Sequence, residues 1–470
     1  MKIFFILIIA FLFEINSNFL RNLDSQPEPP AGDPPSGNPP SGDAPGNGGN
    51  GGGPGGSSTN TYNYSNYKAA STNEDLSRET LESTTADQSV VYITDKSKTI
   101  SDSTLKKTSG DSSNTEISEF YGVNAAILVQ SGEVTITGGT ITTNAKGANA
   151  LCATNNGKVI ITGTKIESTG QSSARGLHAT YGGSITASDV TISSTGGSCA
   201  TLATDRGEGT VTCTNCQLST AGAGSPLIYS TGQITVTNTT GTSTGAQAVV
   251  VEGKNTATVK GNSELKCHGI GNRNNVDKCG IMLYQSMSGD ADNGISKFNC
   301  LNSKIEIVSD SNVYSSAPMF FITNTQASIN LEKCTFSYGS KIFLNAAGTS
   351  EWGNSGSNGG DVTLTLKNQN IEGDFVVDSN SALNIILTGS SSIKGTFNSA
   401  KTASKLNITL DSTSTIELTG DSYYTSLTNG DSSGNNIITG NYKWGDNQNN
   451  SNNISLNLFL LLIISFFVIK

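Results

Sequence analysis

The chain has 470 residues, of which 38 are acidic and 28 basic, so its formal net charge at neutral pH is −10. Nucleic-acid binding needs clustered basic residues, and this balance disfavours it. Charged residues make up only 14% of the chain, while glycine alone contributes 53 residues. The surface must therefore be covered largely by Thr, Ser and Asn, and we expect neither a nucleic-acid partner nor a cofactor.

The first 67 residues contain a targeting segment and a linker. Residues 1–17 carry one lysine, then an apolar run too short to cross a membrane, then small and polar residues. This is the pattern of a cleaved secretory signal peptide. In residues 18–67, nine of the 11 prolines lie between Pro27 and Pro54, and a glycine-rich tract overlaps their end. Such a composition cannot bury a core, so we expect a disordered linker.

A coil that recurs every 22 to 26 residues between residues 122 and 260 sets the fold. In each coil a glycine opens one short strand, a second strand follows it and a third precedes it. The glycines are Gly132, Gly157, Gly183, Gly209 and Gly232. Three period-2 strands per coil, rich in Thr and Val, indicate a parallel β-solenoid. Because parallel crossovers are right-handed, we predict an all-β, single-stranded right-handed parallel β-helix over residues 68–440, with about a dozen coils.

In the strand that precedes each glycine, both alternating sets of residues are largely apolar. One set holds Ile127, Leu151, Leu177, Thr201, Leu227 and Val249, and the other holds Leu128, Cys152, His178, Leu202, Ile228 and Val250. Only one set can face the core. Either a neighbouring segment covers the outer set, or that set is an exposed apolar stripe that marks a binding surface.

The glycine-led strands carry a second outward pattern, a T-x-T ladder. Its members are Thr135/Thr137, Ile160/Thr162, Thr186/Ser188, Thr212/Thr214, Thr235/Thr237 and Thr258/Lys260. Regular threonine arrays on flat solenoids can bind ice, which makes ice binding a remote alternative function. Threonine is also favoured in any exposed strand, and Ile160 and Lys260 interrupt the array.

Six of the eight cysteines fall into two groups. Cys213, Cys216, Cys300 and Cys334 occupy positions where other coils carry Ile, Val or Leu, and we expect them to fill the core. The C-x-x-C spacing of Cys213 and Cys216 lacks the second pair that a zinc site needs, so we predict no metal site. Cys267 and Cys279 flank an insertion, and we predict a disulfide between them that closes this loop, at a gain of up to ~3 kcal/mol.

Polar residues gather at the corner just after the third strand, and they are the candidate site. They are Tyr181, Asp205, Arg206, Glu252, Tyr284, Gln285, Asp290 and Asp292. Asp205 and Glu252 lie two coils apart, roughly 10 Å, near the upper limit for an inverting carboxylate pair. Three interpretations are open: solvated turn residues, a glycan-contact edge without chemistry, or a polysaccharide lyase or hydrolase. The chain has only two histidines and lacks Asp-Asp, Gly-His-Gly and Arg-x-Lys, so we expect no catalytic residues.

Residues 441–470 end in a hydrophobic tail, Leu456–Ile469, preceded by a polar spacer and the small triplet Gly445–Asn447. The tail is shorter than the ~30 Å hydrocarbon core, and the three parts together form a GPI-attachment signal with Gly445 as the site. Asn449 and Asn450 are runner-up sites, and a short membrane anchor is the alternative. We expect a protein on the extracellular face of the membrane, held by a lipid anchor, with N-glycosylation sequons at Asn63, Asn238 and Asn407.

From about Tyr121 to Leu427 the chain resembles secreted bacterial right-handed parallel β-helix proteins of the pectin-lyase-like, adhesin-like group. The segments that carry the resemblance are Phe120–Ala126, Ala179–Ala187, Ala203–Gly207, Tyr284–Asp290, Trp352–Gly360 and Gly420–Tyr423. The resemblance implies a surface role and no reaction, and the pectinase catalytic motifs are missing. We therefore predict a non-catalytic, adhesin-like rod that displays its faces to a polysaccharide or a cell-surface ligand, with a carbohydrate-active enzyme as the alternative.

Overall fold

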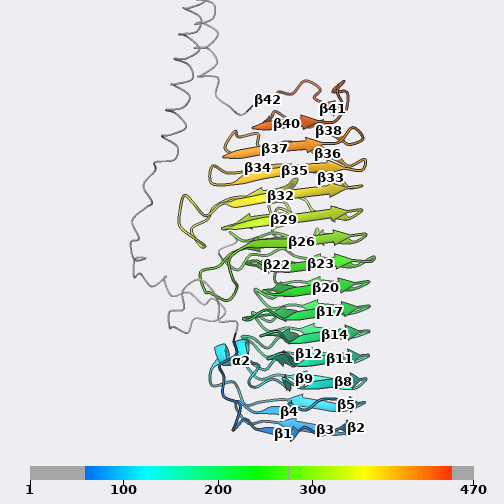
Figure 1. The fold of residues 1–470 in the computed structure, drawn as a ribbon, viewed down its shortest axis with the longest axis vertical. Helices are drawn as coiled ribbons and strands as arrows, with labels where there is room; N and C mark the ends of the chain where they lie inside the picture. The colour runs from blue at the N-terminus through cyan, green and yellow to red at the C-terminus, as the bar shows by residue number, and fades with distance from the viewer. Residues whose placement is uncertain (1–58, 274–275, 447–470) are drawn as a thin grey trace, which may run out of the picture. The chain divides into compact units, whose positions relative to one another are not determined.

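The computed structural model describes residues 59–273 and 276–446. These residues form a stack of coils in which the strands are paired in parallel and follow the chain from the blue to the red end of Figure 1. The predicted parallel β-helix with three strands per coil is confirmed. The predicted signal peptide, the first part of the linker, and the tail beyond Asp446 lie outside the described residues.

Sheet A is built from the strands that precede the glycines. Its 12 strands pair in chain order. They are β1 (Ala69–Thr72), β4 (Ser89–Ile93), β7 (Ile127–Gln130), β10 (Leu151–Thr154), β13 (Leu177–Ala179), β16 (Leu202–Thr204), β19 (Ile228–Ser230), β22 (Val249–Glu252), β25 (Ile281–Tyr284), β28 (Phe320–Thr323), β31 (Ile342–Ala346) and β34 (Asp374–Val377).

Sheet B is built from the glycine-led strands and has 14 members, slightly more than the dozen coils expected. They are β2 (Leu76–Ser77), β5 (Lys98–Ser101), β8 (Glu133–Thr137), β11 (Lys158–Thr162), β14 (Ser184–Ser188), β17 (Thr210–Thr214), β20 (Gln233–Thr237), β23 (Thr256–Lys260), β26 (Ile295–Leu301), β29 (Thr325–Glu332), β32 (Gly360–Lys367), β35 (Ala382–Thr388), β37 (Lys405–Leu410) and β40 (Ser426–Asn429).

Sheet C follows sheet B in each coil, after a turn of two or three residues. Its ten strands are β3 (Thr80–Ser83), β6 (Thr104–Lys107), β9 (Thr140–Thr143), β12 (Lys165–Ser168), β15 (Thr191–Ser194), β18 (Gln217–Thr220), β21 (Thr240–Ser243), β24 (Glu264–Cys267), β27 (Lys304–Ile307) and β30 (Thr335–Ser337). In the last coils two short sheets complete the stack. They hold β33 (Asn370–Glu372), β36 (Ser392–Gly395), β38 (Thr415–Leu418) and β41 (Ile437–Ile438), and β39 (Ser422–Tyr424) with β42 (Trp444–Asp446).

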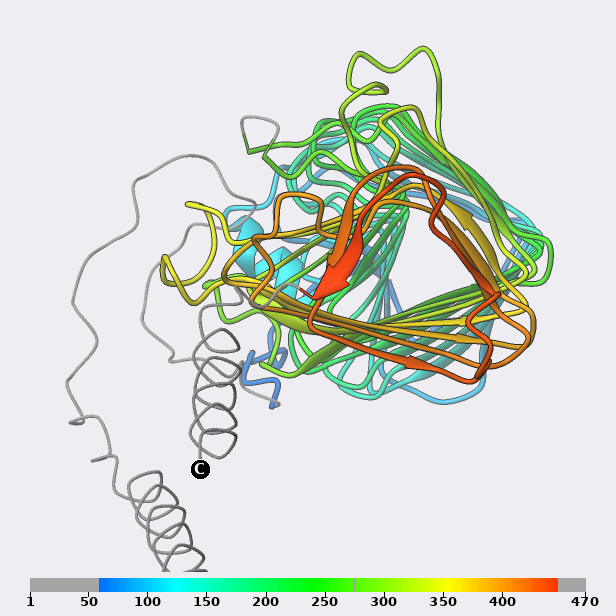
Figure 2. The same ribbon diagram turned by 90° about the horizontal axis from the view of Figure 1, so that it is seen from above.

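The core runs through the inside of the stack and is made by the alternation within each strand. In sheet B, for example, Val134, Val159, Ile185 and Val211 lie in register one above another and are buried. Each such side chain removed from water contributes roughly 1.5–3 kcal/mol. Since a single coil cannot enclose its own inner face, only stacking makes this burial possible. Seen from above, the coils superimpose on one another (Figure 2).

One short helix, α2 (Thr115–Tyr121), lies outside the coils, on sheet A (Figures 1 and 2). Asn114 caps its N-terminus by accepting a hydrogen bond from the Glu116 amide. Gly122 ends it in the left-handed conformation at φ 71°, where a Cβ would lie 2.4 Å from the Cys152 sulfur. The helix therefore sits tightly against the outer face of the sheet. No helix in the described part of the chain is long and apolar enough to span a membrane.

The outward residues of sheet A are covered by neighbouring segments, so they do not form an exposed apolar stripe. The inward column is Ile127, Leu151, Leu177, Leu202, Ile228 and Val249, so the predicted alignment was off by one residue at Thr201 and Leu227. The outward column is Leu128, Cys152, His178, Ala203, Tyr229 and Val250. Its two ends belong to separate apolar clusters, one with Tyr64 and Tyr67 and one with Trp352.

The N-terminal cluster includes a segment that the sequence placed in the linker. Tyr64 and Tyr67 pack on Tyr92, with ring centroids 6.3 and 5.0 Å away. The Tyr64 hydroxyl donates to the Tyr121 carbonyl at 2.7 Å. Residues 59–67 are therefore part of the packed body, because their tyrosines cover sheet A.

The predicted Cys267–Cys279 disulfide is wrong, since both thiols are free in the structure. Cys267 packs in the main core, whereas Cys279 packs in the apolar cluster on the outer side of sheet A. The disulfides join Cys213 to Cys216 and Cys300 to Cys334 instead. These four cysteines are buried as expected, but they also form crosslinks. Cys213 and Cys300 lie in strands of sheet B, and their partners Cys216 and Cys334 lie in the turns that follow β17 and β29.

Candidate functional site

The predicted corner residues do come together, on the outer side of sheet A, but they are not a solvated edge. Asp205 and Glu252 are each only 1% exposed, and Tyr181 and Gln285 are also buried. Arg206, Tyr284, Asp290 and Asp292 are partly exposed. The expectation of exposed charges at Asp205 and Glu252 is therefore wrong. Helix α2 and the loop after β25, residues 285–294, cover them.

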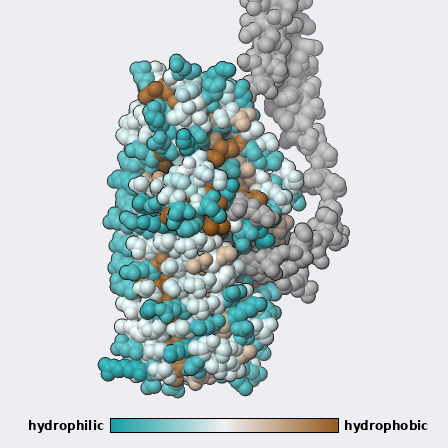
Figure 3. Space-filling model, turned by 180° about the vertical axis from the view of Figure 1, so that it is seen from behind, coloured by the Kyte–Doolittle hydropathy of each residue, from teal (hydrophilic) through white to brown (hydrophobic). Residues whose placement is uncertain are grey.

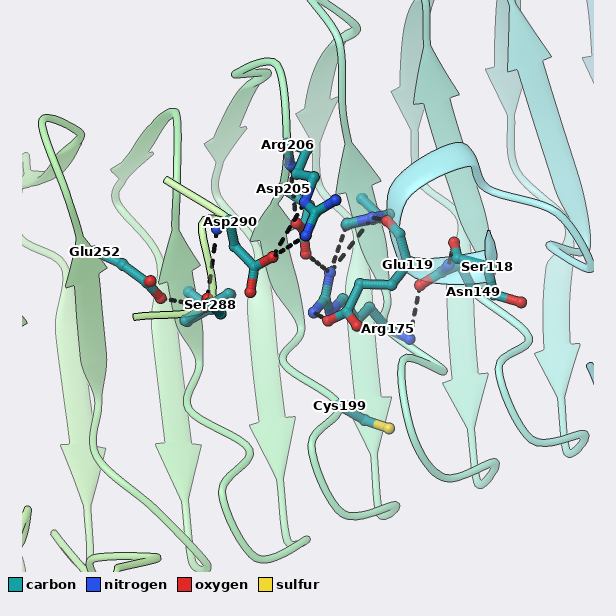
Figure 4. Close-up of polar contacts among 12 residues, drawn as sticks. Ser118, Glu119, Asn149, Arg175, Cys199, Asp205, Arg206, Glu252, Ser288 and Asp290 are labelled. Carbon is teal, nitrogen blue, oxygen red and sulfur yellow. Dashed lines mark hydrogen bonds and ion pairs between the residues drawn. The ribbon is translucent and has the colours of Figure 1, made fainter. Parts of the chain in front are cut away.

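A buried ion cluster joins α2 to sheet A (Figure 4). The Arg175 guanidinium lies between two acids, donating to Glu119 of α2 and, at 2.7 Å, to Asp205. His178 contacts the Glu119 carbonyl through Nε2 at 2.7 Å. Asn149 accepts from the Arg175 amide and donates to the Ser118 carbonyl. Every polar group of this cluster thus has a partner from another coil or from the helix.

Burial dominates the electrostatics of this cluster. It raises the pKa of the Glu119 and Asp205 carboxyls, and Arg175 between them opposes the rise. Burial, and then the adjacent guanidinium, lower the pKa of His178 well below its usual range. The imidazole is therefore neutral at physiological pH. It acts here as a packed hydrogen-bonding group and not as a proton carrier.

A second ion pair ties the loop after β25 to the corner. Arg206 contacts Asp290 of that loop through Nε at 3.2 Å and through the terminal nitrogen at 3.1 Å. The guanidinium also lies over the Phe120 ring of α2, with its carbon 3.7 Å from the ring centroid. One arginine thus bridges two of the segments that cover sheet A, namely α2 and the loop after β25.

Glu252 is the centre of a third network. Its carboxylate accepts hydrogen bonds from the hydroxyls of Tyr229 and Tyr284, both at 2.6 Å, and from Ser286. Burial, followed by the nearby Asp290, raises its pKa, while the three hydroxyls oppose the rise. Tyr284 in turn packs edge-to-face on Trp352 at 5.3 Å. The carboxylate therefore anchors the covering loop.

A small pocket of about 240 Å³ opens beside these networks. Lys254 lies across it and pairs with Glu208 at 2.7 Å and Asp292 at 2.9 Å, and all three side chains are substantially exposed. Asp290 and Thr231 also line the pocket. The Thr231 hydroxyl is buried and has no hydrogen-bond partner among the described residues. The open part of the corner is thus this pocket.

The geometry limits the chemistry that the corner acids can perform. A glycosidase needs one carboxyl to reach the glycosidic oxygen and another to reach the opposite face of the sugar. Asp205 is held by Arg175, and both Glu252 oxygens accept internal hydrogen bonds. Among the described residues no group of three or more His, Cys, Asp or Glu side chains is arranged to hold a metal ion.

Sequence reasoning missed Glu119, Arg175, Glu208, Thr231 and Lys254. A signal existed for Glu119, because Asn114 and Gly122 bracket a short helix with the residues typical of an N-cap and a C-cap. Arg175 stands two residues before an apolar strand, and nothing local indicates its burial. Lys254 and Glu208 join through coil stacking, which the repeat alignment did not use.

The remaining predicted residues are on the surface. The T-x-T ladder is in register as aligned, with Thr135, Ile160, Thr186, Thr212, Thr235 and Thr258 on neighbouring strands. Asn63 and Asn238 are exposed, and Asn407 is partly exposed. Gly445 lies in β42, where it pairs with Tyr423 of β39.

The comparisons agree with the fold. A family model described as a right-handed β-helix region matches residues 87–264. Together with the all-parallel sheets, this match defines a right-handed parallel β-helix of the pectin-lyase-like type. Comparison with curated proteins and with solved structures gave no match.

Proposed function

We propose that this β-helix protein is a non-catalytic surface protein that contacts glycans at the corner of sheets A and B. The proposal rests on the different roles of the buried and the exposed charged residues at the corner. The buried acids Asp205 and Glu252 fasten α2 and the covering loop, while Glu208, Lys254 and Asp292 remain open beside them.

The open pocket supports binding more than catalysis. Its size, about 240 Å³, is below the usual range of drug-sized ligand sites and suits one sugar ring. Carboxylate oxygens and an ammonium group supply acceptors and donors for sugar hydroxyls, each contact being charge-assisted. The Thr231 hydroxyl beneath them lacks an internal partner, so a ligand that shifts the Lys254 side chain would supply one.

A glycan array probed with the secreted protein, lacking the hydrophobic tail, tests the proposal. We expect binding to at least one glycan and about tenfold weaker binding for Lys254→Ala or Asp292→Ala. The matched control is Lys394→Ala, which removes another exposed Lys–Glu pair, at 2.9 Å, far along the stack. Equal binding by all variants would overturn the assignment of the corner.

The enzyme alternative has its own test. A panel of polysaccharides is incubated with the protein, and reducing ends and unsaturated products are measured. We expect neither above the level of a protein-free control. Release of product by the wild type that Asp205→Asn and Glu252→Gln abolish, with folding intact, would establish the enzyme instead.

The proposed location is the extracellular face of a membrane, with a GPI anchor at Gly445. The support is the sequence of signal peptide, small triplet, spacer and short apolar tail. Treatment of intact cells with phosphatidylinositol-specific phospholipase C should release the protein. Retention of the protein, while a control GPI protein is released, would favour a short membrane anchor. Glycosidase digestion should show sugars first at Asn63 and Asn238, the more exposed sequons.

A further inference from the structure

A second surface, far from the corner pocket in the coil, has the properties of a ligand groove. It lies on the outer face of sheet C and has a volume of about 380 Å³. It crosses four neighbouring strands, β15, β18, β21 and β24. Three of these strands contribute only short or uncharged outward side chains, and those are Thr191, Ser193, Gln217, Ser219, Thr240 and Thr242.

The floor of the groove is lowered by a glycine. The inward column of sheet C holds Ile192, Leu218 and Leu265, but β21 has Gly241 at this position. A Cβ on Gly241 would lie 2.7 Å from the Leu227 methyl group, so β21 approaches the core more closely than a strand with a side chain could. Glycine within a strand often marks a place where a ligand approaches closely.

Among the described residues, the uncharged polar side chains of the groove have no side-chain hydrogen-bond partner. None of the six uncharged side chains makes a side-chain hydrogen bond to another described residue. In this they differ from Asp205 and Glu252, which lie in hydrogen-bond networks. Their hydroxyl and amide groups therefore face solvent as both donors and acceptors. A chain of sugar rings carries complementary hydroxyl groups.

Strand β24, at the edge of the groove, differs from the other strands of sheet C that carry a lysine and a glutamate. On β12 and β27 a lysine and a glutamate two residues apart pair with each other, Lys165 with Glu167 at 2.5 Å and Lys304 with Glu306 at 3.0 Å. On β24 the same spacing places Glu264 and Lys266 in the groove lining, and within the described residues neither forms an ion pair. One carboxylate and one ammonium group thus face the groove outside any close ion pair, and their charges balance. Their neighbours on β27 are Lys304 and Glu306, and the pKa of Lys304 is raised by Glu306 and, more weakly, by Glu264.

We infer that this groove is a second binding site, for a linear, uncharged glycan whose rings lie across the strands. The ~4.8 Å spacing of the strands is close to the length of one pyranose unit in an extended chain, so four strands match about three or four rings. The balanced charge of Glu264 and Lys266 favours hydroxyl ligands over polyuronates, since a polyanion would need excess cationic groups. This site is independent of the corner pocket.

The test uses cellohexaose, laminarihexaose and hexagalacturonate with the secreted protein lacking the tail. Ser219→Trp fills the groove, and Thr212→Trp on sheet B of the same coil is the matched control. We expect at least one uncharged hexamer to bind, Ser219→Trp to abolish that binding and Thr212→Trp to leave it unchanged. Lys266→Ala and Gln217→Ala should each weaken it about tenfold.

Three outcomes would overturn the inference. In the first, uncharged hexamers bind the Ser219→Trp and Thr212→Trp variants equally well. In the second, the ligand is hexagalacturonate, and Ser219→Trp abolishes its binding. In the third, no hexamer binds. The corner variant Lys254→Ala separates the two sites. If Lys254→Ala abolishes binding and Ser219→Trp does not, only the corner proposal is supported. If Ser219→Trp abolishes binding and Lys254→Ala does not, only the groove proposal is supported.

Discussion

Each coil contributes to the outer faces of both sheet A and sheet B. The outer face of sheet A is covered by other segments, whereas that of sheet B contacts solvent. Outward residues of sheet A are buried beneath α2, residues 59–67 and the loop after β25, and they include an ion cluster. Outward residues of sheet B are threonines, asparagines and charges in contact with solvent. Figure 3 shows one face of the stack, where hydrophilic and neutral residues dominate and hydrophobic patches are small.

The repeat fixes the inside of the coil and leaves the outside free. Inward positions must be apolar in every coil, because stacking buries them regardless of what lies outside. Outward positions are constrained only where another segment covers them. A charge on sheet B is solvated, whereas the same charge on sheet A must find a partner in the protein. The following predictions test this difference.

The largest effect is expected at Arg175. Replacing it by methionine leaves Glu119 and Asp205 buried without their shared cation, which should cost roughly 3–5 kcal/mol of unfolding free energy. Lys158→Met on sheet B, which removes an exposed pair with Glu133 at 3.3 Å, should cost less than about 1 kcal/mol. Urea denaturation of both variants measures the difference. Equal losses would contradict the distinction between the two faces.

The crosslinks inside the core should matter to different degrees. Cys300 and Cys334 are 34 residues apart, and chain-entropy reasoning assigns about 4 kcal/mol to such a bridge. Cys213 and Cys216 are three residues apart, and their bridge is worth about 2 kcal/mol. Double Cys→Ala variants should lower the denaturant midpoint in that order. If the two double variants lose the same stability, loop length does not control the effect.

Lys107 tests a charge that points inward. It is fully buried at the end of β6, and its ammonium donates to the Thr85 carbonyl. Burial lowers the pKa of Lys107 to about 8, while Asp87 and Asp111 oppose the shift. Because the folded form loses the proton first, the charged lysine costs stability below pH 8, and this cost disappears as the pH rises toward 10.5.

The pH dependence of a Lys107→Met variant isolates this cost. Subtracting its unfolding free energy from that of the wild type removes the titration of all other groups. The variant should be more stable at pH 7 by up to about 3 kcal/mol, since 2.5 pKa units correspond to that energy. The advantage should shrink between pH 8 and 10.5. An advantage that is constant with pH would contradict the assigned pKa.

The smallest effect is expected on the threonine ladder of sheet B. Ile160, at 54% exposure, interrupts the ladder, and Ile160→Thr should change stability by less than about 0.5 kcal/mol. The same variant, combined with Lys260→Thr, completes the array that ice binding would require. We expect no thermal hysteresis in the wild type or in the completed ladder. A freezing-point gap that grows on completion would instead favour ice binding.

The local pattern of the sequence was enough to predict the coil. Gly-led strands with period-2 alternation placed the inner residues of sheets B and C correctly, because the alternation is a local property of each strand. It also brought Asp205, Arg206, Glu252 and Asp290 to one corner. It failed by one residue at Thr201 and Leu227, because both sets in sheet A are apolar and the hydrophobic pattern there cannot fix the register.

The segments that cover each face, and the groups that pair there, depend on contacts between distant parts of the chain. Glu119 meets Arg175 across 56 residues, and Cys300 meets Cys334 across a whole coil. Cys267 and Cys279, which flank one loop, pack in different apolar clusters and stay free thiols. These outcomes depend on the vertical stacking of coils and on segments outside the repeat. A periodic pattern carries information about one coil, whereas burial outside the coil depends on which segment the chain folds over it.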